Sequence, residues 1–378
     1  MARNHRGRRR AVTWAALLVW LIGALTATHC ARPQSPPALQ VGIAYGDRLV
    51  WMSDRQLAAA LDDAASVGAR WVRADLSWAD IQPDSPHQYR WRLFDRVVRA
   101  ASARGLHVLP VLAYTPSWAR PAGCAADKCP PADPRAFAAF ARTAAQRYAP
   151  RGIHRWEVWN EPNIPAFWQP APDPAAYTGL LRATGRALRQ ADPSARVILG
   201  GLSAVPTSGG KISAPDYLSA VLAHGGGRAV DAVGYHPYTY PDLASAATTP
   251  GMAWAGIDRT RDSLHGLLAR YGRPDTPVWI TEFGAPTDGP GAASDGRPGT
   301  TEGGTTHVTE ERQGAIAADA VRTADRTPHV AALIWYTERD LGTDRSSPEN
   351  FFGLRRADGS PKPALGALRR AIASLHGT

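Results

Sequence analysis

Lysine is scarce in this chain of 378 residues, although the formal net charge is +10. Only three of the 43 basic residues are lysines, at Lys128, Lys211 and Lys362. Five arginines lie within residues 1–31, which contain no acidic residue, so the rest of the chain carries a formal charge of +5. No basic run interleaved with aromatic residues remains after this segment, and nucleic-acid binding is therefore not expected.

The motifs of several enzyme classes are also missing. His107 and His236, the two histidines that we assign to strand ends, are not spaced like metal ligands. No Gly-x-Ser-x-Gly sequence provides a serine nucleophile, and no Gly-Lys-Ser loop provides a phosphate cradle. These absences argue against metal-dependent hydrolases, serine hydrolases and phosphate-binding enzymes, and we expect neither a metal ion nor a cofactor.

The N-terminus has a basic run followed by an apolar stretch from Ala11 to Ala27. This order is typical of an export signal. Leu25 occupies the position three residues from the cleavage point at Ala27, where a small residue is preferred, so an uncleaved membrane anchor is an alternative. We interpret residues 1–31 as a signal peptide or signal anchor, 32–38 as a linker and 39–378 as one folded domain. The protein is then secreted or associated with the cell envelope.

Cysteine is nearly as rare as lysine, with three in the whole chain. Cys30 belongs to the N-terminal segment. Cys124 and Cys129 flank a short loop, and in an exported protein such a pair is expected to form a disulfide.

Short apolar runs alternate with alanine- and arginine-rich helical patterns along the rest of the chain. This alternation predicts an α/β fold with a parallel sheet, and eight strand–helix units predict a (β/α)₈ TIM barrel. The eight runs expected as strands are 41–44, 71–75, 107–112, 155–161, 196–200, 230–235, 277–283 and 331–336.

Capping residues mark the helices between these runs. Ser53 is expected to cap the first helix, and Gly105 ends a helix over residues 93–104. The pairs Asp133-Pro134 and Asp173-Pro174 each supply an N-cap followed by proline at the first helical position. Further helices are expected at 215–224, 257–271, 310–326 and 361–375.

Two glutamates end the fourth and seventh of the expected strands. Strict alternation puts Glu157, Trp159 and Glu161 on one face of the fourth, and it puts Glu282 on the same face as Val278 and Ile280. Because active sites of barrels lie at the carboxyl ends of the strands, Glu161 and Glu282 are expected to share one site. The glycine-rich insert 284–304 follows Glu282 directly and is a candidate mobile loop over that site.

Two carboxyl groups suffice for hydrolysis of a glycosidic bond, where one protonates the leaving oxygen and the other acts on the opposite side of the sugar. Four short sequences here resemble clan A of the retaining glycoside hydrolases: Trp159-Asn160-Glu161-Pro162, Thr281-Glu282-Phe283-Gly284, Tyr235-His236-Pro237-Tyr238, and Trp335 on the eighth strand. Within the clan, segments 109–118 and 156–163 are similar to family thirty-nine and its bacterial cellulase-like relatives. The resemblance extends from about Val41 to the C-terminal helix.

The resemblance implies that Glu161 is the general acid/base and Glu282 the nucleophile. Asn160 would bind the sugar 2-hydroxyl, and Tyr238, or else His236, would lie beside the nucleophile. Arg73 on the second strand would keep Glu282 ionised.

Several implied contacts have structural alternatives. Arg73 can instead form a buried pair with Glu157. Trp335 would form the floor of the subsite for the cleaved sugar, or else belong to the core. Trp118 and Trp168, on the loops after the third and fourth strands, suit either sugar stacking or ordinary loop packing.

These features predict an exported, monomeric, retaining glycosidase that cleaves a β-linked oligo- or polysaccharide through two displacements. Its two carboxyl groups should then lie about 5–5.5 Å apart. The alternatives are a transglycosylase on the same scaffold and a barrel that binds polysaccharide without cleaving it.

Overall fold

The computed structural model describes residues 38–246, 252–297 and 306–375. The expected signal or anchor (1–31), the linker except for its last residue, and the end of the glycine-rich insert lie outside these residues. Within the described ranges, no helix is long and apolar enough to cross a membrane.

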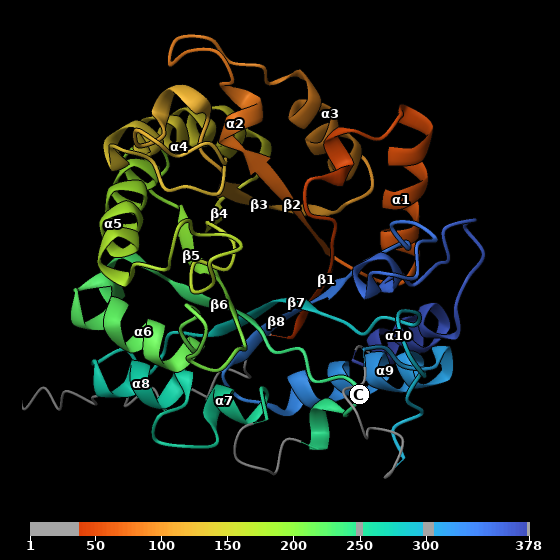
Figure 1. Ribbon diagram of the computed structural model, residues 1–378. Helices are drawn as coiled ribbons and strands as arrows, with labels where there is room; N and C mark the ends of the chain where they lie inside the picture. The colour runs from red at the N-terminus through yellow and green to blue at the C-terminus, as the bar shows by residue number, and fades with distance from the viewer. Residues whose placement is uncertain (1–37, 247–251, 298–305, 376–378) are drawn as a thin grey trace, which may run out of the picture. The chain divides into compact units, whose positions relative to one another are not determined.

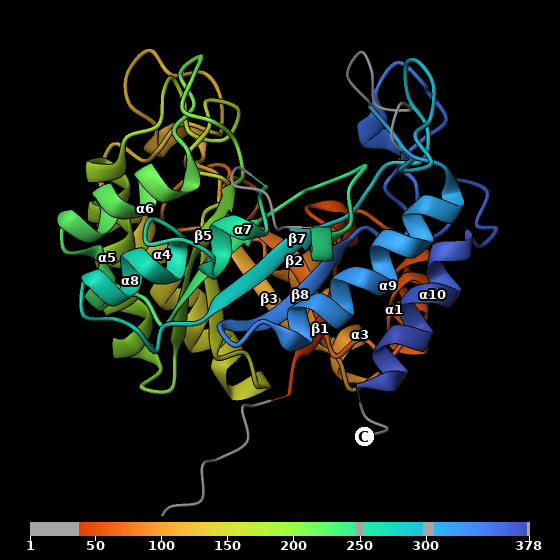
Figure 2. The same ribbon diagram turned by 90° about the horizontal axis from the view of Figure 1, so that it is seen from below.

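Eight parallel strands form a closed barrel in which every strand pairs with the next and β8 pairs with β1. Figure 1 views this barrel along its axis, with the helices around it, and Figure 2 views it from the side. The strands are β1 (Gln40–Ala44), β2 (Trp71–Ser77), β3 (His107–Ala113), β4 (Arg155–Val158), β5 (Arg196–Ser203), β6 (Ala232–His236), β7 (Val278–Phe283) and β8 (Val330–Tyr336). The predicted TIM barrel is confirmed, although β4 ends three residues earlier than expected.

Ten α-helices in the described residues surround the strands. They are α1 (Asp54–Ser66), α2 (Trp78–Ile81), α3 (Arg92–Ser102), α4 (Pro134–Tyr148), α5 (Pro174–Ala191), α6 (Ala214–Ala223), α7 (Ala255–Asp258), α8 (Leu264–Arg270), α9 (Glu310–Arg326) and α10 (Pro363–Ser374). The expected caps are present: Ser53 forms a capping box with Gln56, and Asp133 and Asp173 accept hydrogen bonds from the first turns of α4 and α5.

The single helix expected over residues 257–271 is wrong. Two helices, α7 and α8, occupy this region, and Ser263 caps the second by accepting a hydrogen bond from the Gly266 amide. A serine hydroxyl offers the backbone a partner that starts a new helix, which interrupts the apolar pattern read as one helix.

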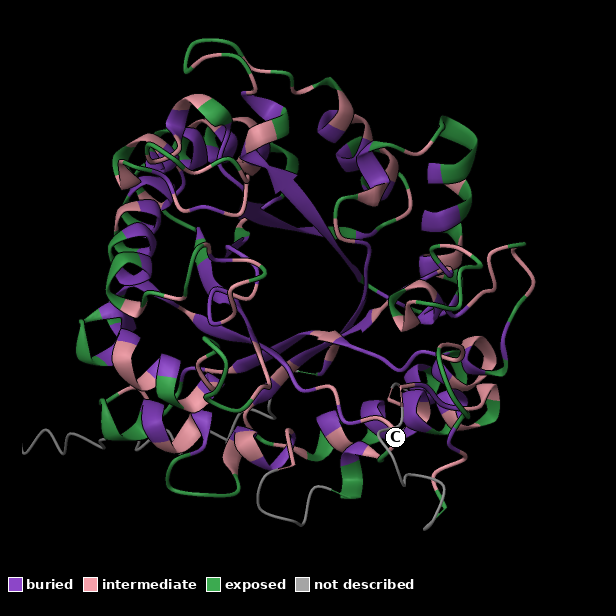
Figure 3. Ribbon diagram, in the orientation of Figure 1, coloured by how far each residue is buried: buried purple, intermediate pink, exposed green. Residues whose placement is uncertain are grey.

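The barrel divides its buried side chains between two clusters. The larger cluster lies between the strands and the helices, where Trp78 packs against Phe137 and Phe140 of α4. A smaller cluster fills the inside of the barrel and includes Trp71, Leu109, Ile198, Trp279 and Ile334. Figure 3 shows the strands as almost entirely buried, so polar groups at their carboxyl ends are held on a rigid base.

Candidate active site

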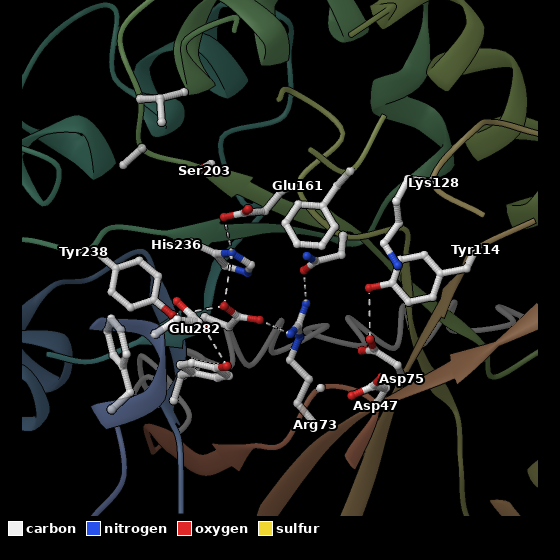
Figure 4. A pocket seen from close by; sticks show the side chains of 18 of the residues that line it. Asp47, Arg73, Asp75, Tyr114, Lys128, Glu161, Ser203, His236, Tyr238 and Glu282 are labelled. Atoms are coloured by element: carbon white, nitrogen blue, oxygen red, sulfur yellow. Dashed lines mark hydrogen bonds and ion pairs between the residues drawn. The ribbon is translucent and has the colours of Figure 1, made fainter. Parts of the chain in front are cut away.

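A cavity of about 560 Å³ opens at the carboxyl ends of the strands. Six of the predicted site residues line it: Arg73, Asn160, Glu161, His236, Tyr238 and Glu282. Figure 4 shows Glu161 and Glu282 pointing toward one another with the His236 ring between them. The structure therefore brings the two glutamates together as expected.

Glu282 lies among groups that stabilise its negative charge. The Arg73 guanidinium donates to its Oε1, the Tyr238 hydroxyl donates to Oε2 at 3.0 Å, and His236 Nδ1 lies 3.7 Å from Oε2. Burial alone would raise the pKa of this carboxyl, but the positive charges of His236 and Arg73 and these hydrogen bonds outweigh burial and lower it. Glu282 is thus held as a carboxylate, the form that a nucleophile requires.

Glu161 occupies an unusual backbone position just beyond β4. Its φ is 41°, and that of Trp159 is 72°, so both residues lie in the left-handed region that side chains rarely adopt. The Glu161 amide is held by the Gly201 carbonyl at 3.0 Å. This turn reverses the expected alternation: Trp159 packs outside the barrel against Phe137, while Glu161 faces the cavity. The prediction that Trp159 shares a face with Glu157 is therefore wrong.

The alternation is also interrupted in β7. Val278 and Ile280 belong to the cluster outside the barrel, whereas Glu282 lines the cavity. The β7–β8 register shifts between Ile280 and Phe283, and an irregularity of this kind re-aims a side chain. Glu282 reaches the site because of this shift, so its expected common face with Val278 and Ile280 is wrong.

Arg73 contacts both of its predicted partners, Glu282 and Glu157. Its Nε donates to Glu157 Oε2 at 2.6 Å, its Nη1 to Glu282 and its Nη2 to Asn160 Oδ1 at 2.7 Å. Because the Asn160 carbonyl oxygen is turned toward Arg73, the amide nitrogen is left for another acceptor. Arg73 therefore connects Glu282, the buried Glu157 carboxylate and Asn160, the predicted ligand of the 2-hydroxyl.

A chain of hydrogen bonds determines which His236 nitrogen carries a proton. Thr281 donates its only hydroxyl hydrogen to Glu157 at 2.9 Å, so its oxygen accepts from His236 Nε2, 3.1 Å away. The other ring nitrogen, Nδ1, lies 3.0 Å from Glu161 Oε1. A proton must lie between these two atoms, because a lone pair of Nδ1 and a carboxylate oxygen would otherwise repel each other. Glu161 and His236 therefore share one proton.

Gly201 leaves the space that His236 needs. A Cβ atom at this glycine would lie 1.9 Å from His236 Nε2. The Gly201 amide also donates to Glu157 Oε1 at 2.8 Å. A larger residue here would displace the ring that contacts Glu161.

The spacing of the two glutamates follows from their common neighbour. Glu161 Oε1 lies 3.0 Å from His236 Nδ1, and Glu282 Oε2 lies 3.7 Å from the same nitrogen. The distance between these two carboxylate oxygens is largest when the three atoms are collinear, and it then equals the sum of the two distances. That limit is at the low end of the roughly 6.5–9.5 Å range of inverting enzymes. Any bend at Nδ1 brings the oxygens closer, toward the separation of about 5–5.5 Å that is typical of retaining enzymes.

The structure does not place the three predicted tryptophans in the cavity. Trp335 is buried outside the barrel against Phe283, because Ile334 and Tyr336 on either side of it face inward. Trp168 is buried against Trp159 and Tyr177. Trp118 packs on Trp78 and donates to the Gln82 carbonyl at 2.7 Å. All three tryptophans therefore take part in core or loop packing, which was the alternative to a place in the sugar site.

Other aromatic residues line the cavity instead. Tyr336, at the inward end of β8, takes the place that was predicted for Trp335, and Phe167 lines the cavity where Trp168 was expected. Tyr240 and Phe352 complete this lining. Strict alternation along β8 identifies Tyr336, but no local pattern distinguishes Phe167 from Trp168.

The sequence analysis missed a polar cluster that lies on the opposite side of the cavity from Tyr238 (Figure 4). It consists of Asp75, Tyr114 and Lys128. Tyr114 donates to Asp75 Oδ2 at 3.0 Å, and Lys128 Nζ lies 3.5 Å from the centre of the Tyr114 ring. Burial raises the pKa of Asp75 to about 6, despite the charge of Arg73 and the bond from Tyr114. Asp75 follows Arg73 by two residues on one strand, so alternation would have indicated it.

Lys128 reaches the cavity from the loop closed by the predicted disulfide. Cys124 and Cys129 are bonded, with Cα atoms 6.5 Å apart, which confirms that prediction. Thr115 donates to the Cys129 carbonyl at 2.7 Å and attaches the loop to the end of β3.

Of the glycine-rich insert, residues 284–297 are described, and the Ser294 amide donates to the His307 carbonyl. No cluster of potential metal ligands occurs in the parts of the chain that the structure describes.

The sequence model of the cellulase family, glycosyl hydrolase family 5, matches residues 36–310 and includes both glutamates. The chain belongs to this family. It is therefore a glycosidase, and its clan is the retaining clan A. The clan resemblance is confirmed. No curated protein matches the sequence significantly.

Solved structures with the same fold include members of glycoside hydrolase families 39 and 5. A family 39 glycoside hydrolase from Bacteroides cellulosilyticus WH2 shares 24% identity with a TM-score of 0.67, over 90% of this chain and 64% of that one. This chain thus spans less than two thirds of that protein. A GH5_18 protein from Streptomyces cattleya, in complex with GlcNAc, has 20% identity, a TM-score of 0.67, and coverage of 90% and 81%. A monomeric β-xylosidase from Caulobacter crescentus CB15 has 19% identity, a TM-score of 0.64, and coverage of 89% and 68%.

Proposed function

We propose that this glycosidase is exported and cleaves a β-linked oligo- or polysaccharide by double displacement, with Glu282 as nucleophile and Glu161 as general acid/base. The observation that carries the proposal is the unequal environment of the two carboxyl groups. Glu282 receives hydrogen bonds from Arg73 and Tyr238, whereas Glu161 shares a proton with His236. One group is therefore ready to attack and the other to donate a proton.

In the first step, a Glu282 oxygen forms a bond to the anomeric carbon as the bond to the leaving oxygen breaks. The proton held between Glu161 and His236 passes through Glu161 to that leaving oxygen. A covalent glycosyl ester remains on Glu282, and the Asn160 amide donates to the sugar 2-hydroxyl during both steps.

In the second step, Glu161 acts as a base and removes a proton from water. The resulting oxygen attacks the anomeric carbon from the side that the leaving group vacated, and the ester bond to Glu282 breaks. Two inversions give net retention, and Glu161 is again protonated next to His236.

A β-linkage agrees with the β-xylosidase from Caulobacter crescentus among the structural neighbours and with the cellulase name of the family. The basic and apolar N-terminal residues support export, with cleavage or anchoring as the two alternatives.

A hydrolysis screen against neutral β-linked glycans tests the proposal. The wild type should release sugar whose anomeric configuration, followed by NMR at early times, is that of the substrate, while Glu161→Gln should release very little from the same glycan. Initial release of the inverted anomer would overturn double displacement. Transfer to an added sugar acceptor in preference to water would identify a transglycosylase.

A further inference from the structure

Few large apolar side chains are exposed in the part of the chain that the structure describes. They are Trp51 with 61% of its surface exposed, Tyr271 with 43% and Leu341 with 37%. Two of the three, Trp51 and Leu341, line one cavity of about 540 Å³. Tyr271 lies at the end of α8, far along the chain from this cavity.

This second cavity adjoins the active site. Asp47, just after β1, lines both cavities. The walls come from residues after β1, from the start of α1, and from the loop after β8, including Arg339. In Figure 1, α1 and the segments after β8 lie side by side at the edge of the barrel. The Arg48 guanidinium donates to the Arg339 carbonyl at 3.2 Å, so the loop after β1 and the loop after β8 are joined at the cavity wall.

The backbone on both sides of Trp51 is held in place. Arg96 of α3 donates to the carbonyls of Val50, at 3.0 Å, and Met52, at 2.5 Å. Its other terminal nitrogen donates to the Asp54 carboxylate at 2.8 Å, and the Trp51 amide donates to the Arg48 carbonyl at 3.0 Å. An exposed indole on a fixed backbone loses little conformational entropy when a ligand binds.

The remaining walls of the cavity are polar and carry both signs of charge. Arg48 and Arg55 supply donors, Asp47 and Asp340 supply acceptors, and Gln56 supplies both. A flat aromatic face surrounded by mixed donors and acceptors suits a pyranose ring, which has an apolar face and hydroxyls around its edge. The opposing charges favour a neutral sugar over a uronate or a sulfated one.

We propose that this cavity is a distal sugar subsite, in which Trp51 stacks against a sugar ring of a neutral glycan several units from the cleaved bond. The proposal rests on the proposed function. The order of the strands in the barrel indicates on which side of the cleaved bond this subsite lies. The loop after β8 is next to β7, which carries Glu282, and it is opposite β4, after which Glu161 lies. The bound sugar therefore belongs to the part of the substrate that stays on Glu282 after the leaving group departs.

Substrate length tests the subsite. We would measure kcat/KM for neutral β-1,4-linked xylo- and gluco-oligosaccharides from disaccharide to hexasaccharide, and for an aryl glycoside of one sugar. The wild type should gain with length, and Trp51→Ala should lose about tenfold in kcat/KM on the longest substrates, mainly through KM. Its activity on the aryl glycoside should stay within about twofold of the wild type. Trp51→Tyr should restore most of the loss.

Tyr271→Ala is the matched control, because it removes another exposed aromatic ring without touching either cavity, and it should behave like the wild type at every length. Equal losses of Trp51→Ala on the aryl glycoside and on the hexasaccharide, or no loss on either, would overturn the subsite. So would binding of a protein partner at Trp51 without any preference for longer glycans.

Binding measured by calorimetry gives a readout that does not need turnover. In the Glu161→Gln background, which hydrolyses very little, the protein should bind the hexasaccharide more tightly than the disaccharide, and the additional change Trp51→Ala should remove that difference. A wild type that binds longer glycans through Trp51 but hydrolyses none would refute the proposed function and support the subsite. Equal affinity for glycans of all lengths, together with normal hydrolysis, would refute the subsite and support the proposed function.

Discussion

The two ends of the barrel interior have opposite chemistry, although the same strands build both. At the amino ends, Trp71 and Trp279 meet edge to face with ring centres 5.4 Å apart, and the exposed Arg155 guanidinium lies over both rings. Two residues further along β2, Arg73 is only 1% exposed and holds three polar partners, among them the fully buried Glu157.

Burial of charge has a different consequence at each end. At the amino end the charged group keeps contact with water while its neighbours bury apolar surface, and this arrangement stabilises the fold. At the carboxyl end each buried charge needs a partner to offset the loss of water, so the network adds little net stability. The amino end should therefore govern stability, and the carboxyl end should govern turnover.

The largest effect is expected for Glu282→Ala at the carboxyl end. Turnover should be abolished for substrates with good and poor leaving groups alike, since no glycosyl ester can form, while the free energy of unfolding changes little. Added azide should restore turnover and yield the glycosyl azide of inverted configuration. Azide rescue of the Glu161 variant with inversion would instead exchange the two roles.

Glu161→Ala should have the next largest effect. It should slow substrates with poor leaving groups by about 10²–10⁴-fold, because these depend on proton donation. Substrates with good leaving groups should form the glycosyl ester at nearly the normal rate, which pre-steady-state kinetics can measure. An equal loss for both kinds of substrate would contradict the assignment.

Trp279→Ala at the amino end should lower stability and leave turnover almost unchanged, the opposite of the two glutamate variants. Loss of a buried aromatic side chain costs about 3–5 kcal/mol, and Trp279 also contacts Trp71 and Arg155. Denaturant unfolding should show this loss, while kcat of the folded fraction stays near that of the wild type. A large fall in kcat with unchanged stability would remove the distinction between the two ends.

The wild-type activity should have a bell-shaped dependence on pH. The pKa of Glu282 is lowered, so this group stays charged, and activity persists, below the ordinary range of a glutamate near pH 4.3. The pKa of His236 is raised: burial lowers it, but Glu282 and Glu161 outweigh burial. The shared proton should then persist above about pH 6.5, and activity should fall only at higher pH. Profiles of kcat/KM check both limbs, and an alkaline limb below that value would contradict the shared proton.

The smallest effect is expected for Arg155→Gln. Loss of the cation–π contacts with Trp71 and Trp279 should cost about 0.5–1 kcal/mol in the free energy of unfolding. Arg196→Gln is the matched control, because Arg196 neighbours Arg155 across the β4–β5 pairing without lying over either ring. A loss of stability in both variants would point to a general effect of charge at this end.

Local patterns were enough to predict the barrel and much of the active site. Apolar runs, the caps at Ser53, Asp133 and Asp173, and the polar ends of the fourth and seventh strands depend on residues close in sequence. The predicted contacts of Arg73 and of Tyr238 with Glu282 are present as well, but the resemblance to clan A implied them and no local pattern did.

The sequence by itself determined which residues lie at or just beyond the ends of the strands, but the tertiary structure decided where their side chains point. Glu161 faces the cavity because its amide meets the Gly201 carbonyl of β5 and the chain turns through a left-handed conformation. Trp51 lies beside a loop that begins almost 300 residues later in the chain. Such placements arise from contacts between distant segments, whose free energy appears only when the barrel closes, so no local pattern encodes them.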